Sequence, residues 1–147
     1  MPTAAKLAAA VLFGALAWAA SSLMRPYFPE GTDLGLFAEV NAAVGAVLGW
    51  RIAGPRGGTG WTAAVGYGIT ATVAIVVVAA FLHCVAIMVR QSLRKLYDGP
   101  VEAVADVFEL MIRNSGAYLL HGDVLLVLAL GGVLAGLLVE WFGRTFR

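Results

Sequence analysis

The feature that most constrains this chain is an uncharged stretch, Gly57–Val89, of 33 residues without Asp, Glu, Lys or Arg. Its centre, Val73–Leu82, is wholly apolar. A helix rises about 1.5 Å per residue and a bilayer's hydrocarbon core is about 30 Å thick, so roughly 20 residues suffice to cross. A strand would be far shorter, and a core helix of a water-soluble protein would have a polar face. The stretch predicts a membrane-spanning helix.

The composition extends this prediction to the whole chain. Of its 147 residues 61% are hydrophobic and 13% charged, against about 25% charged in soluble domains. We therefore expect a single transmembrane domain, 1–147, with the lipid bilayer as its first partner. The net charge of +1 gives no sign of nucleic-acid binding. Lys6 and the apolar run after it resemble a signal peptide, but the uncharged run continues to Met24 and favours an uncleaved span.

The expected fold class is all-α, an integral membrane four-helix bundle with one short amphipathic interfacial helix between the third and fourth spans. We expect the spans at about 5–24, 34–52, 62–89 and 123–141. Between about 100 and 113, apolar residues recur at helical spacing and acidic residues lie opposite them. That helix is too charged to cross, and we expect it to pack against the basic segment formed by Arg90, Arg94 and Lys95. Thr32 or Asp33 is expected to cap the second span.

Small residues at four-residue spacing predict close contacts between the spans. Such faces let helices approach one another in lipid. One face in the second span and one in the third are expected to meet as an antiparallel hairpin, and the fourth span has a similar face. The glycines expected to mediate helix packing are Gly45 and Gly49, Gly60 and Gly68, and Gly132 and Gly136.

A few polar residues interrupt the spans and are candidates for buried polar groups: Glu39, Asn41, Cys84 and Glu140. Ionisable groups at membrane depth are costly and often functional. For the two glutamates the alternative is a structural carboxylate near the membrane interface, and we favour it. Cys84 is the only cysteine, so no disulfide can form within the chain.

The far end of the long stretch carries a candidate oxyanion-facing group, His83, Arg90 and Arg94, which share one helix face. Arginine suits oxyanions, although arginines at a helix end also reach towards the membrane surface. A metal site of His83, Cys84 and His121 is conceivable, but packed side chains are the favoured interpretation, and we predict no metal and no cofactor. No nucleophile with an aligned base is apparent, so no enzymatic activity is expected.

Four spans place both termini on one side of the membrane. Basic residues divide evenly between the two sides, but the terminal side has the short basic loops and three tryptophans. We therefore predict that both termini are cytoplasmic. The tryptophans are Trp50, Trp61 and Trp141.

Four segments in order resemble the TrgA-like tellurium-resistance membrane proteins of alphaproteobacteria: 1–7 (MPTAAKL), 28–32 (FPEGT), 97–100 (YDGP) and 131–138 (GGVLAGLL), followed by Glu140 and Trp141. The resemblance implies an integral inner-membrane protein associated with tellurite resistance. It brings no catalytic residues with it.

The leading hypothesis is therefore a contribution to tellurite resistance, by oxyanion exclusion or export or by support of membrane redox balance. One alternative is an accessory subunit or assembly factor of a larger membrane complex, or a homo-oligomer, because one bundle need not use every small-residue face. A second is a small ion-coupled transporter, with Glu39 and Glu140 as coupling acids.

Overall fold

The structure, a computed structural model, describes residues 4–94 and 98–146, and these residues form helices and turns without any strand. Three helices are long and apolar enough to cross a membrane: α1 (Ala4–Met24, continued by the turn η1, Arg25–Tyr27), α3 (Trp61–Leu93) and α5 (Gly122–Thr145). They match the first, third and fourth expected spans. The prediction of an all-helical, multi-pass membrane protein is confirmed at this level.

The second expected span is a helix whose hydrogen-bonding pattern changes along its length. α2 (Phe37–Leu48) continues through a π-helical turn, η2 (Gly49–Ala53), and a 3₁₀ turn, η3 (Gly54–Arg56). It begins later than expected because Asp33 turns the chain back locally, its Oδ1 accepting the Gly35 N–H at 2.9 Å. The prediction that Thr32 or Asp33 caps this helix is wrong, since the N-cap is Leu36.

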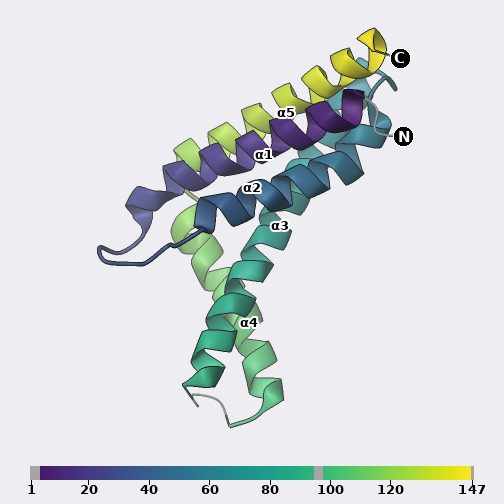
Figure 1. Cartoon of the computed structure of the whole chain (residues 1–147). Coiled ribbons are helices and arrows are strands. Elements are labelled where there is room, and N and C mark those ends of the chain that lie inside the picture. The colour runs from purple at the N-terminus through teal and green to yellow at the C-terminus, as the bar shows by residue number, and fades with distance from the viewer. Residues whose placement is uncertain (1–3, 95–97, 147) are drawn as a thin grey trace.

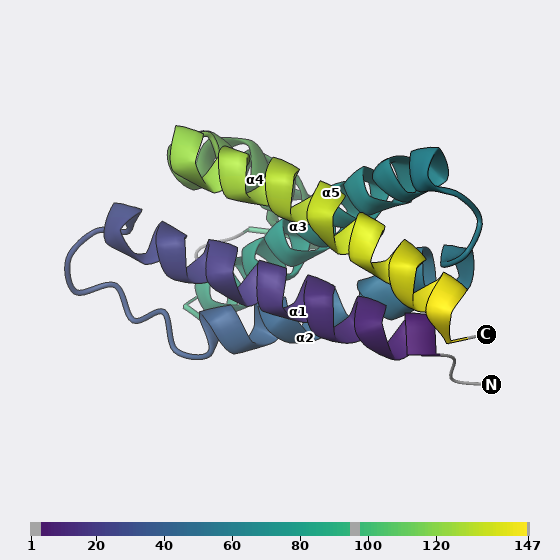
Figure 2. The same ribbon diagram turned by 90° about the horizontal axis from the view of Figure 1, so that it is seen from above.

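The helices meet at two ends, which we define by their contacts. At the terminal end, Lys6, the 54–60 turn and Arg144 come together: a Cβ on Gly54 would lie 2.8 Å from Lys6 Cγ. At the loop end, the Tyr27 ring stacks on His121 at 3.6 Å between centroids, and its hydroxyl donates to Asp123 Oδ2 at 2.8 Å. Figures 1 and 2 show both chain termini at the terminal end and α1, α2 and α5 running beside one another.

Glycines mediate the closest helix contacts, but not between the expected partners. A Cβ on Gly49 would lie 2.6 Å from Ala9 O and 2.8 Å from Phe13 Cβ, and Gly45 faces Phe13 and Ala17. Both glycines therefore pack on α1, and the predicted hairpin contact between the second and third spans through these faces is wrong. Spacing identifies a small-residue face, but it does not say which helix covers it.

The third span's small face packs on α5 instead. Gly68 lies against Gly132 and Gly136. A Cβ on Gly68 would meet the Gly132 carbonyl, and one on Gly136 would meet the Ala64 carbonyl and Gly68 Cα, so neither position has room for a side chain. Thr72 continues this contact, because its side chain meets Gly132. The assignment of Gly60 to helix packing is wrong. It precedes α3 with φ of 137°, and a Cβ there would meet nothing within 4 Å.

The second half of α3 leaves the bundle and pairs with α4 (Pro100–Asn114), and Figure 1 shows the two helices projecting together as an arm. α3 has 33 residues and is therefore about 50 Å long, more than the hydrocarbon thickness. α4 matches the expected 100–113 helix. Its buried Val107 and Leu110 pack on Cys84. This contact is apolar, whereas we expected one with the basic segment; Arg90 and Arg94 are exposed, and Lys95 lies outside the described residues.

Candidate functional site

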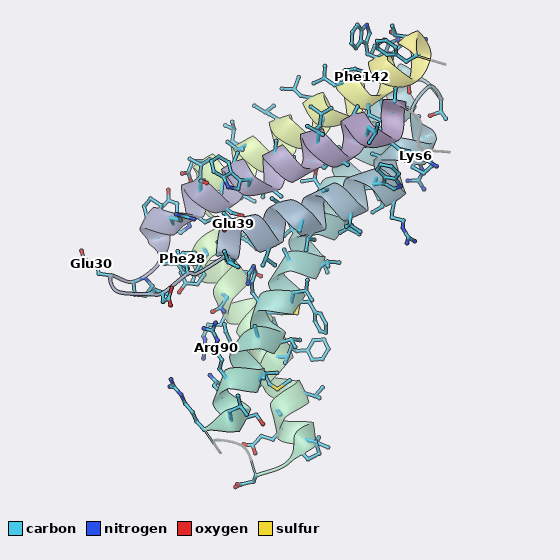
Figure 3. All side chains as sticks on the ribbon, viewed as in Figure 1. Lys6, Phe28, Glu30, Glu39, Arg90 and Phe142 are labelled. Carbon is cyan, nitrogen blue, oxygen red and sulfur yellow. The ribbon has the colours of Figure 1, made fainter. Side chains whose placement is uncertain are left out.

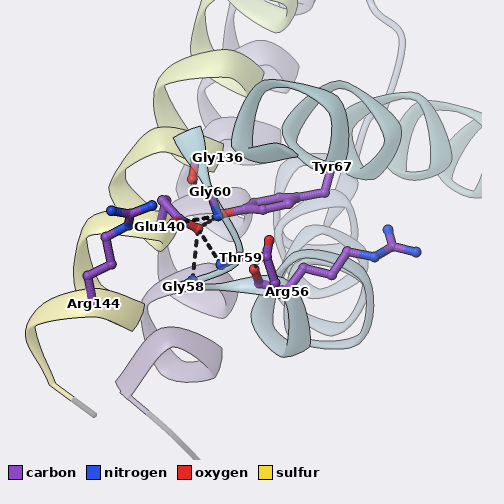
Figure 4. A network of polar contacts seen from close by, with 8 residues as sticks. All are labelled: Arg56, Gly58, Thr59, Gly60, Tyr67, Gly136, Glu140 and Arg144. Carbon is purple, nitrogen blue, oxygen red and sulfur yellow. Dashed lines mark hydrogen bonds and ion pairs between the residues drawn. The ribbon is translucent and has the colours of Figure 1, made fainter. Parts of the chain in front are cut away.

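Two polar centres lie inside the apolar bundle, one at each end. The first surrounds Glu140 near the terminal end (Figure 4). The second is a cavity bounded by α1, α2, α3, the α4–α5 connection and α5, near the loop end. Glu140 and the cavity residue Leu128 are twelve positions apart on α5, about 18 Å along the helix. The two centres are therefore distinct.

The Glu140 carboxylate, completely buried, is held by the turn before α3. Its Oε2 accepts the N–H groups of Gly58 and Thr59 at 2.8 and 3.0 Å. Its Oε1 accepts the Gly60 N–H at 2.8 Å and Arg144 Nε at 2.7 Å. Three successive N–H groups can point at one carboxylate because Gly58 and Gly60 have positive φ, of 92° and 137°.

Tyr67 closes this centre from α3. Its hydroxyl lies 3.0 Å from Gly136 O and 3.3 Å from Glu140 Oε2, so its single hydrogen is shared between two acceptors. Arg144 also lies over the Trp61 ring at 5.3 Å, a cation–π contact. Glu140 thus fastens α5 to the α2–α3 turn through three N–H groups and to α3 through Tyr67, while Arg144 pairs with it from the next turn of α5. The favoured structural interpretation of Glu140 agrees with this geometry.

The second centre contains a buried row of hydrogen bonds across three helices. Ser21 on α1 donates to Ala17 O at 2.7 Å and accepts from Asn41 Nδ2 at 2.8 Å. Asn41 Oδ1 lies 2.8 Å from His83 Nε2. Because that oxygen can only accept, Nε2 carries a hydrogen. Ser21 was not predicted from the sequence as a site residue. The sequence feature that could have identified it is a polar side chain within the first span, at the same depth as Asn41 in the second span.

The cavity beside this row has a volume of about 270 Å³. Of the predicted site residues, Asn41, His83, Cys84 and Arg90 line it, and Arg94 and Glu39 do not. Glu39 is exposed in the first turn of α2, so its assignment as a buried polar group is wrong for the isolated chain. In Figure 3, Arg90 lies on the arm below the loop that carries Phe28 and Glu30.

Aromatic rings form the rim of the cavity, which sequence reasoning also missed. Phe37 lies 4.6 Å from the His83 ring between centroids, and Phe28 lies 5.4 Å from Phe37 and 4.2 Å from Tyr118. These rings come from the α1–α2 loop, α2 and the α4–α5 connection. Phe37 packs directly on His83, and Phe28 and Tyr118 extend this aromatic contact along the rim. Their relation could not be read from spacing, because it joins segments about 90 residues apart.

Two cavity side chains, His83 and Arg90, have hydrogen-bonding atoms that are free to bind a ligand. Among the described residues, nothing bonds to His83 Nδ1, and no acid or acceptor bonds to the Arg90 guanidinium. Asp33 also lines the cavity, with its Oδ1 engaged by Gly35. His83 and Arg90 can therefore both face a bound molecule.

The described residues contain no group of three or more His, Cys, Asp or Glu side chains that could hold a metal ion. His121 stacks on Tyr27 and does not join His83 and Cys84. Comparison of the chain with family models, with curated proteins and with solved structures finds no match. What the chain does must therefore be argued from its own geometry.

Proposed function

We propose that this chain is a four-span protein of the bacterial inner membrane that binds an oxyanion in the loop-end cavity and thereby contributes to tellurite resistance. The observation that carries the proposal is that Arg90 and His83, two groups with free donors or acceptors, line the same cavity. The family resemblance supplies the name of the oxyanion, tellurite.

A fourth crossing, formed by α2 with η2 and η3, is supported by where the other helices begin. α1 and α3 both start at the terminal end. A Cβ added to Gly57, shortly before α3, would lie 2.8 Å from the Cβ of Ala5, near the start of α1. The segment between them must therefore return through the full thickness of the bundle. From Phe37 to Arg56 it has 20 residues, about 30 Å of helix.

We place α4 at the membrane surface because it has three distinct faces. One packs on α3 through Ala103, Val107 and Leu110. A second is exposed and apolar, a third is acidic, and such a helix can lie with one face in lipid and another in water. The apolar face comprises Val101, Val104, Phe108 and Ile112; the charged face comprises Glu102, Asp106, Glu109 and Arg113.

The chemistry of binding follows from the two cavity groups. The Arg90 guanidinium offers N–H donors in a planar fork that suits an oxyanion. His83 Nδ1 accepts a hydrogen from a protonated oxyanion such as hydrogentellurite, or donates one when the ring is charged. Neither role requires a chemical step, so we propose binding without enzymatic activity.

The test compares two neighbouring arginines. We expect Arg90→Gln to lower the tellurite concentration that expressing cells tolerate, and Arg94→Gln, on the same helix but outside the cavity, to leave it unchanged. Losing charge-assisted hydrogen bonds should weaken binding about tenfold or more. Protein levels in the membrane must be equal. Equal loss in both variants, or in neither, would overturn the oxyanion site.

The features that favoured the two alternative functions, an accessory subunit or homo-oligomer and an ion-coupled transporter, have other roles in this fold. The small-residue faces of Gly45/Gly49, Gly68 and Gly132/Gly136 all pack inside this chain, so they no longer argue for a larger complex or a second copy. A coupling acid must change partners during transport, but Glu140 is tied to the α2–α3 turn, and Glu39 is exposed on the surface of α2. We therefore place oxyanion binding first.

A further inference from the structure

The cavity is much longer than an inorganic oxyanion needs. Its lining on α3 runs from Ile75 to Arg90, fifteen positions or about 22 Å along the helix. Its volume of about 270 Å³ is many times the space that a single water molecule needs. A single small anion held by Arg90 and His83 would leave most of this space unfilled.

The two parts of the cavity differ in chemistry. Near the rim lie Arg90, His83 and Asn41, and the amide of Asn41 is already engaged by Ser21 and His83. The inner part is bounded by Ala20, Val76 and Leu128, which belong to an apolar cluster. Water in an apolar space finds too few hydrogen-bonding partners to be held well. The inner part therefore suits hydrocarbon, and the rim suits an anionic group.

We propose that the cavity binds a single-chain amphipathic anion, with its oxyanion head at Arg90 and His83 and its hydrocarbon chain against Ala20, Val76 and Leu128. This inference rests on the proposed function, because it assigns the same residues to the oxyanion. A carboxylate or phosphate carried on an acyl chain has this chemistry, and a bilayer is a ready source of such molecules. An inorganic oxyanion shares only the head.

The test measures binding of a dansyl-labelled fatty acid to the purified full chain in amphipol, where no micelles compete for the probe. We expect saturable fluorescence enhancement that dodecanoate abolishes and that neutral dodecanol and inorganic phosphate do not. Among unlabelled carboxylates, affinity should rise about fourfold for each added methylene until the inner part is full. This chain-length series uses the unaltered protein and so does not depend on any variant folding.

Matched variants then separate head from chain. Arg90→Gln should weaken fatty-acid binding about tenfold, whereas Arg94→Gln should not change it. Val76→Phe fills the inner part and should abolish binding, whereas Val77→Phe, 52% exposed and outside the cavity, should not.

Each outcome separates the two proposals. If phosphate or tellurite competes with the probe as well as dodecanoate does and chain length has no effect, the chain assignment is overturned and the oxyanion site stands. If Val76→Phe abolishes binding and Arg90→Gln has no effect, the site is purely apolar and both proposals fail. If fatty-acid binding does not saturate, the proposal of an amphipathic ligand is overturned. The tellurite resistance of cells that express the Arg90→Gln variant then still tests the oxyanion site.

Discussion

At the scale of single residues, Glu140 shows how a carboxylate can lie inside an apolar bundle. It receives three backbone N–H groups and one arginine, so no part of its charge is left without a partner. Removing it would leave those N–H groups facing a hole instead of an acceptor. A buried group that loses its partner costs far more than the pair itself contributes.

We predict that Glu140→Ala lowers the stability of the protein by about 3 kcal/mol or more. Glu140→Gln keeps one acceptor oxygen and should cost less. Cys84 provides the measurement, because the only thiol is 2% exposed and reacts with a fluorogenic maleimide once the protein opens on heating. Glu39→Ala, at the exposed glutamate, is the control and should melt like the unaltered chain.

At the scale of elements, the contact between α3 and α5 depends on the absence of side chains. Gly68, Gly132 and Gly136 bring two backbones together, and Tyr67 bonds across the contact to Gly136 O. Close backbone approach gains van der Waals contact where lipid provides no hydrophobic driving force between helices. The arm, by contrast, is held by ordinary apolar side chains.

We predict that Gly136→Ala destabilises the protein by about 1–3 kcal/mol, because the new methyl group meets the Ala64 backbone and Gly68 Cα. Gly66→Ala is the matched control on α3, since a Cβ there meets nothing within 4 Å. It should be neutral or stabilising by up to about 1 kcal/mol. The same thiol-reactivity melting curve compares them, and equal melting temperatures would contradict the close contact.

The sequence predicted the helices well because long apolar runs and the 100–113 periodicity are local properties. It also identified Gly45, Gly49, Gly68, Gly132 and Gly136 as contact positions. It failed on their pairing, because the choice of partner depends on how helices cross, which no spacing records. For the cavity, the sequence predicted His83 and Arg90, together with Arg94, as one oxyanion-facing group, and Asn41 and Cys84 as separate buried polar groups. That all of these except Arg94 line one cavity together with Ser21 and the aromatic rim depends on tertiary packing, which local sequence patterns do not reveal.

At the scale of the whole molecule, the two ends differ in character. The terminal end gathers both termini, the basic 54–60 turn and Trp61, while the loop end gathers aromatic rings and acids. Arginine and lysine concentrate on the cytoplasmic side of membrane proteins, with tryptophans at the interface. Because basic residues divide evenly between the two ends, our prediction that the terminal end is cytoplasmic rests on its short basic loop and its tryptophans.

We predict opposite labelling of two engineered cysteines in a Cys84→Ser background. Thr32→Cys at the loop end should react with a membrane-impermeant maleimide in intact spheroplasts, and Thr59→Cys at the terminal end only after permeabilisation. Both threonines are exposed, and their hydroxyl groups donate to nearby backbone oxygens, at Pro29 and Arg56. Labelling of both sites from outside would contradict four crossings, and the reverse pattern would invert the orientation.

The fastening of Glu140 to the 58–60 turn also has a consequence for the order in which the protein is made. The turn leaves the ribosome about 80 residues before its carboxylate does, so its three N–H groups remain bonded to water while α3, α4 and most of α5 are synthesised. The contacts of this turn with α1, at Lys6 and Ala5, can form before α5 exists, but its N–H groups gain their carboxylate only with the last turns of α5. A chain interrupted before Glu140 would therefore leave these three N–H groups without that acceptor.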